Sequence, residues 1–478
     1  MQYGSHSYNK FVSFFQTTTT TTTTTKLCPE AVDAKFKQLD ESWRTYKTMT
    51  YDCLEQEIGG PQAAEPSYST YGGRMDQRIG SGTGFFAVHK DSDGRWTFID
   101  PDGYKFLSKG FNSVGHFSGK EEVYEQGFND QFNGSEEEMA TKVKELFQDI
   151  GVNTLGSWSE DSMFKGDNRI PYTPRWNFLP NYRNERPGGW IDYYNDRPVP
   201  VFEPEFETFA MKHAEGAEAY KDDPYVLGHF SDNEMPFHAD DLINRFLALN
   251  ETDAGHQAAQ KWLVDNGKTV DDITDDDHNA FCVVMVERYY SIVNNALKTY
   301  DPNHLYLGSR VHGRVAQQDC TFQAARDHVD VMSINYYHRW GPEEFRVDNW
   351  SLQTDGLPLL ITEWYAKGND AIDTSADEIV PIDNIAGAGF TVPTQADRGD
   401  FFEHMTLNLL RKKEVVGWHW HRYADYSANL GLVHHDFIPY QVFAESVKKI
   451  NRNVYSLSDY LWDNTAETHI FMDRPQAY

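Results

Sequence analysis

Short apolar runs alternate with amphipathic segments along most of the chain. The runs that resemble strands lie at 106–115, 152–158, 199–205, 224–230, 304–311, 329–337, 357–364 and 415–423. Helical patterns lie between most of them, notably at 135–149, 278–299, 395–413 and 440–452. Near-continuous apolar strands that alternate with helices indicate a parallel sheet buried on both faces. We therefore predict a (β/α)8 TIM barrel over residues 105–452, with an open doubly wound sheet as the alternative.

The segment before the barrel has a different pattern. Over residues 27–104 we expect a helix at 31–47, then a loop rich in Gly, Pro and Ser. Three short strands follow within 84–110, separated by the turn sequences "DSDG" and "PDG". The prediction is a small helix and β-ribbon extension, while residues 453–478 are expected to form a C-terminal tail.

Residues 1–26 contain nine consecutive threonines, Thr17–Thr25, which cannot build a packed core. We expect a disordered leader here. The apolar stretch "FVSFF" is shorter than the roughly 7–15 apolar residues of a signal peptide, so no clear signal is present. Threonine-rich tracts also occur as O-glycosylated spacers, which leaves a secreted or periplasmic location as a hypothesis.

Composition narrows the class of partner. The net charge of the 478-residue chain is -30, which opposes binding to nucleic acid or anionic lipid. No run of about 18 apolar residues predicts a membrane span. Cys28, Cys53, Cys282 and Cys320 are widely spaced, so the sequence predicts neither a zinc ribbon nor a disulfide framework. An uncharged partner fits this charge better. The aromatic content of 14% also indicates that some rings line a binding surface for that partner.

Two glutamates close predicted strands at places where a barrel carries its chemistry. Glu234 ends the fourth strand in "SDNE", and Glu363 ends the seventh in "LLITEW". A single strand-end glutamate is more often a solvated loop residue or a helix cap. Strands four and seven face each other across a barrel mouth, which allows the roughly 5–5.5 Å carboxyl separation of retaining glycosidases.

Several stretches, in this order and spacing, resemble β-agarases of glycoside hydrolase family 50, within the large clan of retaining (β/α)8 hydrolases. They are "GRWTFIDPDGYKFLSKGFNSVG", "GVNTLGSW", "DPYVLGHFSDNE", "LYLGSR", "WHWHRYAD" and "ANLGLVHHDFIPY", and the resemblance covers about residues 84–452. It implies that Glu234 is the general acid/base and Glu363 the nucleophile. The two carboxyls need different pKa values, which close pairing promotes.

The residue before the acid/base has a role of its own. Asn233 is expected to donate a hydrogen bond to the sugar 2-hydroxyl. Strict strand alternation sends Asn233 and Glu234 to opposite faces, so both can serve one sugar only where the strand twists or bulges.

Further candidates for substrate binding come from the same strand ends. The resemblance implies that Tyr336 hydrogen-bonds the nucleophile, with its neighbour Tyr337 facing the other way into the core. The resemblance implies that Trp420 floors the subsite of the cleaved sugar, with a core tryptophan as the alternative. Arg310 and His312 close the fifth strand and are candidates to contact hydroxyls.

The insertion at 159–198 is dense in rings and arginines, and a long loop of this kind is usually functional or disordered. We expect Trp176 and Trp190, with Trp158 just before the insertion, to bind sugar faces. The alternative is an Arg-aromatic plug on the barrel rim. His419 and His421 share a strand face in the H-x-H spacing of zinc sites, but strand one offers only His116, so no metal is predicted.

These observations predict a retaining glycoside hydrolase that acts on an agarose-type galactan without cofactor or metal. Its partner is a polysaccharide or oligosaccharide, with no nucleic acid and no membrane, and the sequence predicts no oligomeric state. The alternatives are porphyran, carrageenan or another β-glycoside as substrate, or a noncatalytic carbohydrate-binding relative.

Overall fold

The computed structural model describes residues 30–36, 42–58, 65–116, 122–194, 197–373 and 380–463. The leader expected at 1–26 lies outside these residues. The described strands are β1 (Glu30–Ala34), β2 (Arg44–Thr48), β3 (Arg74–Arg78), β4 (Ala87–Lys90), β5 (Trp96–Ile99), β6 (Tyr104–Phe106), β7 (Ser108–Phe111), β8 (Thr154–Leu155), β9 (Gly228–His229), β10 (Leu305–Tyr306), β11 (Val311–His312), β12 (Met332–Asn335), β13 (Leu359–Glu363), β14 (Ala366–Gly368), β15 (Ile372–Asp373), β16 (Val380–Pro381), β17 (Phe390–Val392) and β18 (Val415–Trp420).

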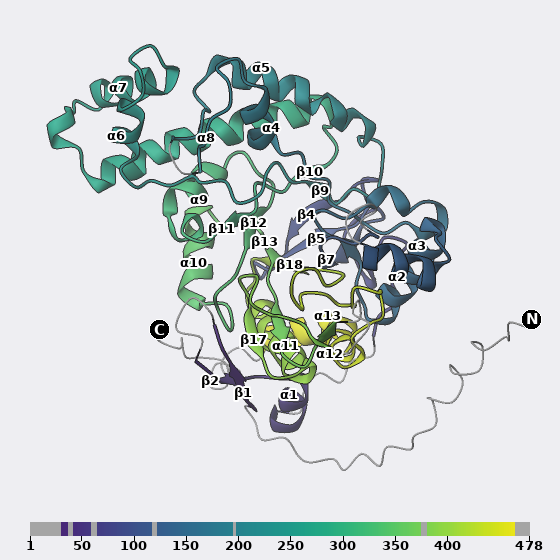
Figure 1. Ribbon diagram of the computed structural model, residues 1–478. Helices are drawn as coiled ribbons and strands as arrows, with labels where there is room; N and C mark the ends of the chain where they lie inside the picture. The colour runs from purple at the N-terminus through teal and green to yellow at the C-terminus, as the bar shows by residue number, and fades with distance from the viewer. Residues whose placement is uncertain are drawn as a thin grey trace, which may run out of the picture.

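The described α-helices are α1 (Tyr51–Ile58), α2 (Glu122–Phe132), α3 (Glu136–Asp149), α4 (Phe178–Glu185), α5 (Pro204–His213), α6 (Leu242–Leu247), α7 (Ala254–Asp265), α8 (Asp275–Tyr300), α9 (Asp319–Ala325), α10 (Glu344–Gln353), α11 (Gln395–Leu410), α12 (Gln441–Arg452) and α13 (Val454–Asp463). Helices surround the central strands: α5 and α8 lie at the top of Figure 1, α2 and α3 at the right, and α11 to α13 at the bottom. None of these helices is long and apolar enough to cross a membrane.

The helix starts follow their capping sequences. Ser135 caps α3 by accepting a hydrogen bond from the Glu138 amide, and Thr274 and Asp277 form a capping box at the start of α8. Three acidic residues fill the first turn of each of these helices, where the helix dipole favours negative charge. The start of the helix predicted at 135–149 is therefore confirmed.

The central strands of this mixed α/β fold pair in parallel. One sheet has the order β11-β12-β13-β18-β7-β8, and β9 pairs with β10 in a second parallel pair. Single parallel bridges join Leu155 to Tyr172, Tyr172 to Val226, and Arg175 to Phe230. The third strand expected at 199–205 is wrong, because that stretch forms a turn and the start of α5, and the pairing passes through Tyr172 instead.

An antiparallel sheet of order β3-β6-β5-β4 includes the three strands expected between 84 and 110. Phe98 and Phe106 of this sheet pack in one buried cluster with Phe86, which directly precedes β4. The partners of these three rings are Leu227, Phe230, Leu305, Leu307, Val331, Leu360 and Val416. Of these seven partners, Leu227, Leu305 and Val331 lie at or before the beginnings of parallel strands, and Leu360 and Val416 are the second residues of theirs. The cluster therefore covers the beginnings of these strands with apolar side chains.

Two other expectations about the ends of the chain are wrong. The described parts of the helix expected at 31–47 instead form an antiparallel pair of strands, β1 and β2, and Lys35 pairs with Thr391 in β17. Residues 454–463 of the tail expected at 453–478 form α13, which buries Val454, Leu457 and Leu461 against the rest of the molecule, while 464–478 lie outside the described residues.

Cysteine pairing also corrects the sequence analysis, which predicted no disulfide framework. A disulfide joins Cys282 in α8 to Cys320 in α9, and Cys53 is disulfide-bonded as well. Packing of α8 against α9 brings together two cysteines that are 38 residues apart in sequence.

We expect the double substitution Cys282→Ala with Cys320→Ala to lower the free energy of unfolding by about 4 kcal/mol. The reason is that cross-linking a loop of this length removes conformational entropy from the unfolded chain. The midpoint of urea unfolding measures the change. Reductant should lower the wild-type midpoint further than that of the variant, whose only reducible bond involves Cys53. Equal midpoints for the oxidised wild type and the variant would contradict this role.

Candidate active site

Polar side chains collect where the parallel strands end. Glu363 is the last residue of β13, and Asn335 is the last residue of β12 and its partner in the sheet register. Arg310 follows β10, and Asn233 and Glu234 follow β9. Since β9 pairs with β10 and β12 with β13, all in parallel, these five residues meet at the same edge.

Arg310 lies at the centre of this group. Its Nη1 donates to Asn233 Oδ1 at 2.9 Å, and its Nη2 lies 2.9 Å from Glu363 Oε1 and donates to the Thr362 carbonyl at 3.0 Å. The side chain is fully buried, and burial lowers the pKa of Arg310 while the charges of Glu363 and Glu234 oppose that shift. A buried guanidinium between these partners fixes Glu363 relative to Asn233.

Glu363 is held by a second donor. Tyr337 donates its hydroxyl to Glu363 Oε2 at 2.8 Å, so each carboxylate oxygen has one partner. Burial and the charge of Glu363 raise the pKa of Tyr337 well above its usual value, so this hydroxyl keeps its proton at physiological pH. Only 7% of the Glu363 side chain is exposed, which leaves it in one orientation.

Glu234 has a more open environment. Asn335 Nδ2 donates to Glu234 Oε1 at 2.8 Å and to Asn233 Oδ1 at 3.1 Å, and Thr362 Oγ1 fixes the amide by donating to Asn335 Oδ1 at 2.8 Å. The Glu234 side chain is 34% exposed, so solvent reaches it.

The backbone at Glu234 is left-handed, with φ of 57°, a conformation that non-glycine residues rarely adopt. This confirms the irregularity predicted from the adjacency of Asn233 and Glu234. It brings both side chains to Asn335, where strict alternation would have separated them.

Two sequence expectations fail for the same geometric reason. Tyr336, expected to bond the nucleophile, is buried on the other side of its segment: its hydroxyl accepts from the Glu343 amide, and its ring packs on Trp350. Trp420, expected to floor a subsite, is fully buried and donates to the Leu430 carbonyl. Neighbouring residues of an extended segment face opposite sides, so Tyr337 bonds Glu363 in place of Tyr336, and His421, next to Trp420, lies beside Trp158.

A stack of rings and cations borders the site. Two guanidinium groups lie over the Trp158 ring, with its centre 4.3 Å from Arg310 and 4.8 Å from Arg175. His421 approaches the edge of Trp158 with ring centroids 5.7 Å apart, and burial lowers the pKa of His421 to about 3. The imidazole is therefore neutral near this cluster of charges.

The remaining predicted residues have separate places. His312 Nδ1 donates to the Asn335 carbonyl at 3.2 Å and lies 3.9 Å from Glu234 Oε1. Trp190 is 61% exposed, and Arg183 lies over its ring at 5.5 Å. Trp176 is only partly exposed because its indole nitrogen donates to His229 Nδ1 and its ring packs beside Tyr220.

Asp232, next to Asn233, has no exposure to solvent. Its carboxyl accepts hydrogen bonds from the Tyr289 hydroxyl and from the Leu179 amide, and burial raises the pKa of Asp232 to about 7. It anchors the segment that carries Asn233 and Glu234 to α4 and α8.

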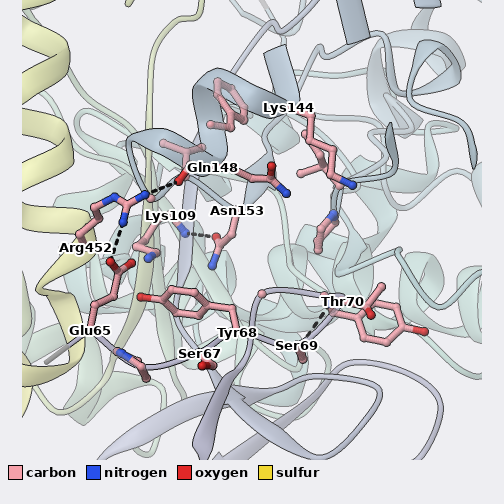
Figure 2. A pocket seen from close by; sticks show the side chains of 18 of the residues that line it. Glu65, Ser67, Tyr68, Ser69, Thr70, Lys109, Lys144, Gln148, Asn153 and Arg452 are labelled. Atoms are coloured by element: carbon pink, nitrogen blue, oxygen red, sulfur yellow. Dashed lines mark hydrogen bonds and ion pairs between the residues drawn. The ribbon is translucent and has the colours of Figure 1, made fainter. Parts of the chain in front are cut away.

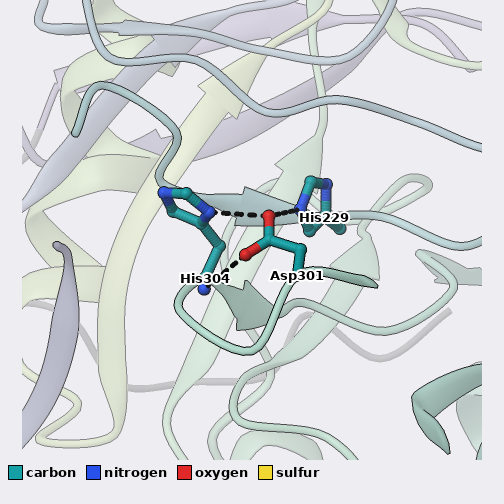
Figure 3. A group of neighbouring side chains, drawn as sticks. All are labelled: His229, Asp301 and His304. Atoms are coloured by element: carbon teal, nitrogen blue, oxygen red, sulfur yellow. Dashed lines mark hydrogen bonds and ion pairs between the residues drawn. The ribbon is translucent and has the colours of Figure 1, made fainter. Parts of the chain in front are cut away.

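Among the residues that the structure describes, no group with metal-ligand spacing includes these carboxylates. His419 Nε2 contacts Ser108 Oγ at 2.8 Å, and the one group of described residues with metal-ligand spacing is His229, Asp301 and His304. In this group Asp301 Oδ2 lies 2.7 Å from His229 Nε2 and 2.7 Å from His304 Nδ1 (Figure 3).

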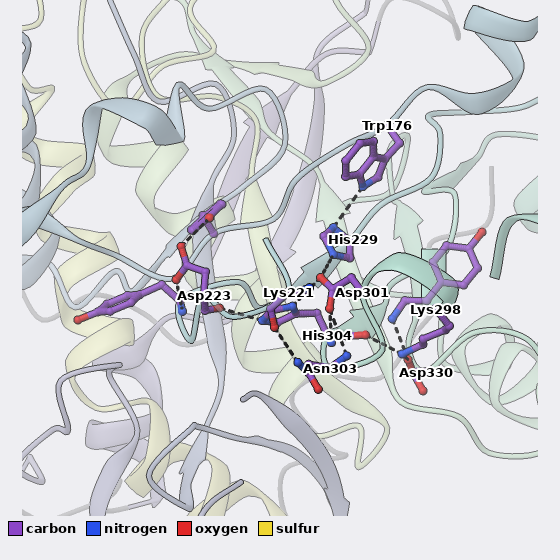
Figure 4. Close-up of polar contacts among 12 residues, drawn as sticks. Trp176, Lys221, Asp223, His229, Lys298, Asp301, Asn303, His304 and Asp330 are labelled. Carbon is purple, nitrogen blue, oxygen red and sulfur yellow. Dashed lines mark hydrogen bonds and ion pairs between the residues drawn. The ribbon is translucent and has the colours of Figure 1, made fainter. Parts of the chain in front are cut away.

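The surroundings of this triad favour hydrogen bonding over metal binding. His229 Nδ1 accepts the Trp176 indole proton, so the proton of the neutral ring is on Nε2, facing Asp301. A zinc ion needs that nitrogen deprotonated. The network continues from His304 Nε2 to the Asp223 carbonyl and joins Trp176 to the segments before β9 and β10 (Figure 4).

Sequence reasoning missed several residues of the site. Asn335 lies near the end of the strand predicted at 329–337, so the rule that selected Glu363 could have found it. Tyr337 and His421 were each assigned to another role. Arg175 lies in an insertion where the sequence gives no register, so no signal distinguished it from the other arginines there.

No protein-family model matches the chain. The crystal structure of BpGH50 is 30% identical to it, with a TM-score of 0.79, and the alignment covers 90% of this chain and 96% of that one. The structure of an exo-beta-agarase has a TM-score of 0.67 at 19% identity and covers 85% of this chain and 69% of that one, which supports the fold alone.

Beta-agarase B from Vibrio sp. (strain JT0107) is 23% identical over 505 residues, which cover 82% of this chain and 50% of the agarase. Beta-agarase A from the same strain is also 23% identical and covers 77% of this chain. The chain spans about half the length of the curated relatives it matches.

The buried triad leads to a stability prediction. Burial opposes ionisation of Asp301, but hydrogen bonds from His229 and His304 hold its pKa below the usual range. We expect Asp301→Asn to lower the free energy of unfolding at pH 7 by about 3 kcal/mol, because both histidines lose an ionised acceptor.

The stability that ionised Asp301 contributes depends on pH. A depressed pKa contributes stability above the unfolded value of about 4 and loses it as pH falls below that value. The difference between wild type and Asp301→Asn in urea unfolding should therefore shrink below about pH 4. Asp222 is exposed, so Asp222→Asn is the matched control and should leave the free energy of unfolding unchanged both at pH 7 and below about pH 4. A constant difference across this range would contradict the assignment.

Proposed function

Since the chain belongs to glycoside hydrolase family 50, we propose that it hydrolyses a β-linked galactan of the agarose type by a retaining, two-step mechanism. The observation that carries this proposal is the pair of glutamates joined by Arg310, Asn233 and Asn335 at one edge of the parallel strands. The names of the relatives, two β-agarases among them, support the substrate class.

The proposed fold of this unit is a (β/α)8 barrel. Parallel pairing leads from β7 to β8, by single bridges through Tyr172 to Val226, and from β9 to β10. The segment that carries β10 and β11 pairs next with β12, and β12, β13, β18 and β7 complete the sequence of pairs. The glutamates then lie at the mouth formed by the carboxyl ends of the strands, where barrel enzymes carry their active sites.

The two glutamates take different roles because their surroundings differ. Glu363 is almost buried, with one oxygen near Arg310 and the other bonded by Tyr337, which suits a nucleophile that must attack from one position. Glu234 is partly exposed and has a single close amide donor, which suits a group that exchanges protons with water.

The reaction follows from these roles. Glu234 protonates the leaving oxygen while Glu363 attacks the anomeric carbon and forms a glycosyl-enzyme ester. Glu234 then removes a proton from the water that attacks this ester, which releases a sugar of unchanged anomeric configuration and restores both groups.

Neighbouring polar groups orient the sugar. The side-chain oxygen of Asn233, Oδ1, accepts hydrogen bonds from Arg310 and Asn335. The side-chain nitrogen, Nδ2, has no partner among the described residues, so it is available to the sugar 2-hydroxyl. His312 and Trp158 border the same opening, and Trp190 is the exposed ring further along the insertion.

Exchange of either glutamate for glutamine should lower kcat on agarose by several orders of magnitude, since each group acts in both steps. Reducing-end release from agarose measures the loss, and Glu137→Gln on the exposed face of α3 is the control. Circular dichroism should show all three variants folded. Wild-type rates in Glu363→Gln would exclude it as the nucleophile.

Azide separates the two roles in this same experiment. With Glu363→Gly, azide replaces the nucleophile and should give a glycosyl azide of inverted configuration. With Glu234→Ala, azide attacks the glycosyl-enzyme ester and should give the retained configuration. Identical azide products from both variants would contradict the assignment, and NMR of the anomeric proton distinguishes the outcomes.

The adjacent tyrosines provide a matched pair for a second prediction. Tyr337→Phe should lower kcat about 10- to 100-fold, the equivalent of roughly 1.5–3 kcal/mol for a hydrogen bond to a charged group. Tyr336→Phe removes only the acceptor of the Glu343 amide and should keep kcat near the wild-type value. Steady-state kinetics on agarose oligosaccharides measures both. An equal loss in the two variants would show that packing, not the bond to Glu363, is responsible.

A further inference from the structure

A second cavity lies away from the candidate active site. Its volume is about 440 Å³, and it is lined by the loop at 65–72, the last turns of α3, residues 151–153 and 169–171, Lys109 and Arg452 (Figure 2). Lys109 lies in the first half of β7, and Asn153 directly precedes β8. The cavity is therefore beside the beginnings of strands, whereas Glu363 and Asn335 end theirs.

The lining is positively charged in a strongly acidic protein. Four lining residues are cationic, Lys109, Lys144, Arg169 and Arg452, and one is acidic, Glu65. Glu65 is already paired with Arg452 at 2.6 Å. The chain as a whole has a net charge of -30, so this concentration of cations runs against the composition of the molecule.

Lys109 is the most unusual member of the lining because it is 2% exposed. Its Nζ donates to the Asn451 carbonyl at 3.0 Å and lies 5.6 Å from the centre of the Tyr68 ring and 5.8 Å from that of Tyr455. Among the parts of the chain that the structure describes, no carboxylate forms an ion pair with it. A buried ammonium without a counter-ion is costly, by several kcal/mol.

We propose that this cavity binds a sugar-sized organic anion, a saccharide carrying a carboxylate or a sulfate ester, whose charged group pairs with Lys109. The ligand supplies the counter-ion that the protein does not. The volume of the cavity is within the roughly 300–1,000 Å³ of small-molecule sites. Tyr68 and Phe147 offer apolar faces to a sugar ring, and Ser67, Thr70 and Gln148 offer polar groups to its hydroxyls.

The pH dependence of binding follows from the groups around Lys109. Burial lowers its pKa to about 7, the charge of Glu65 from the loop opposes this shift, and Arg452 at the end of α12 adds to it. Tyr68 and Tyr455 contribute rings that remain neutral, since burial raises the pKa of each. An anion stabilises the ammonium form, so affinity is highest below about pH 7 and falls as pH rises through that value.

Titration calorimetry of the full chain tests the proposal with four probes: galactose 6-sulfate, galacturonate, galactose and inorganic sulfate. At pH 6, at least one acidic sugar should bind at least tenfold more tightly than galactose and than inorganic sulfate. The affinity of that sugar should be tenfold lower at pH 8.5 than at pH 6. Which acidic sugar binds more tightly distinguishes a sulfate ester from a carboxylate. Equal affinity for galactose, equal affinity for inorganic sulfate, or no binding of either acidic sugar at 10 mM (on the order of the weakest specific sites) would overturn it.

Substitutions then locate the binding. Lys109→Met should abolish the preference for the acidic sugar and its pH dependence, whereas Lys165→Met, an exposed lysine outside the lining, should leave both unchanged. Glu363→Gln should bind the acidic sugar as the wild type does, because the two sites are separate. Wild-type affinity in Lys109→Met would assign this lysine a packing role only and refute the site.

A second variant keeps the test decisive where Lys109→Met fails to fold. Lys144 lines the same cavity from α3 and is partly exposed, so Lys144→Met leaves the core intact. This substitution should lower the affinity for the acidic sugar at least threefold at pH 6 and leave the affinity for galactose unchanged. Unchanged affinity in Lys144→Met, together with a flat wild-type pH profile between 6 and 8.5, would refute the proposal without the Lys109 variant.

Discussion

The buried guanidinium of Arg310 is the interaction on which the candidate site depends. A cation without solvent contact is stable in a protein only when hydrogen bonds and opposite charge surround it. Here Glu363 provides the charge, and Asn233 and the Thr362 carbonyl provide the acceptors. Because these partners come from two segments far apart in sequence, at 233 and at 362–363, one side chain fixes the relative positions of the strand ends that carry both glutamates.

Closure of the opposite end of the strands makes this concentration of polar groups possible. The aromatic side chains of β5, β6 and the segment before β4 cover the beginnings of the parallel strands with an apolar cluster. Polar groups at the other end do not compete with that packing. The division between an apolar floor and a polar mouth therefore originates in the antiparallel sheet that precedes the central strands in sequence.

The sequence predicted elements whose signals are local and missed those that depend on distant partners. Strand ends with Glu234 and Glu363, and helix starts with Ser135, are readable because neighbouring residues define them. The segment at 31–47 looked helical, yet it buries Val32 and Ala34 in alternation because β2 pairs with it and Lys35 pairs with Thr391. That partner is more than 300 residues away, and no window of sequence contains it.

Other failures have equally specific causes. Pro171 and Pro174 remove backbone donors on either side of Tyr172, so the third parallel segment forms single bridges and has no apolar run to detect. The choice of Tyr336 over Tyr337 depended on which of two adjacent residues faces inward. A shift of one residue reverses every side chain of a strand, and composition gives no information about that parity.

The left-handed backbone of Glu234 shows how the two levels combine. A non-glycine residue in this conformation is strained by about 1–3 kcal/mol and persists only where its surroundings fix it. Asp232 is held on one side by Tyr289 and the Leu179 amide, and the Glu234 amide itself donates to the Arg310 carbonyl at 3.3 Å. These contacts anchor the segment on both sides of Asn233. The sequence indicates that an irregularity must exist between two adjacent polar residues, and the buried network behind them explains why the chain maintains it.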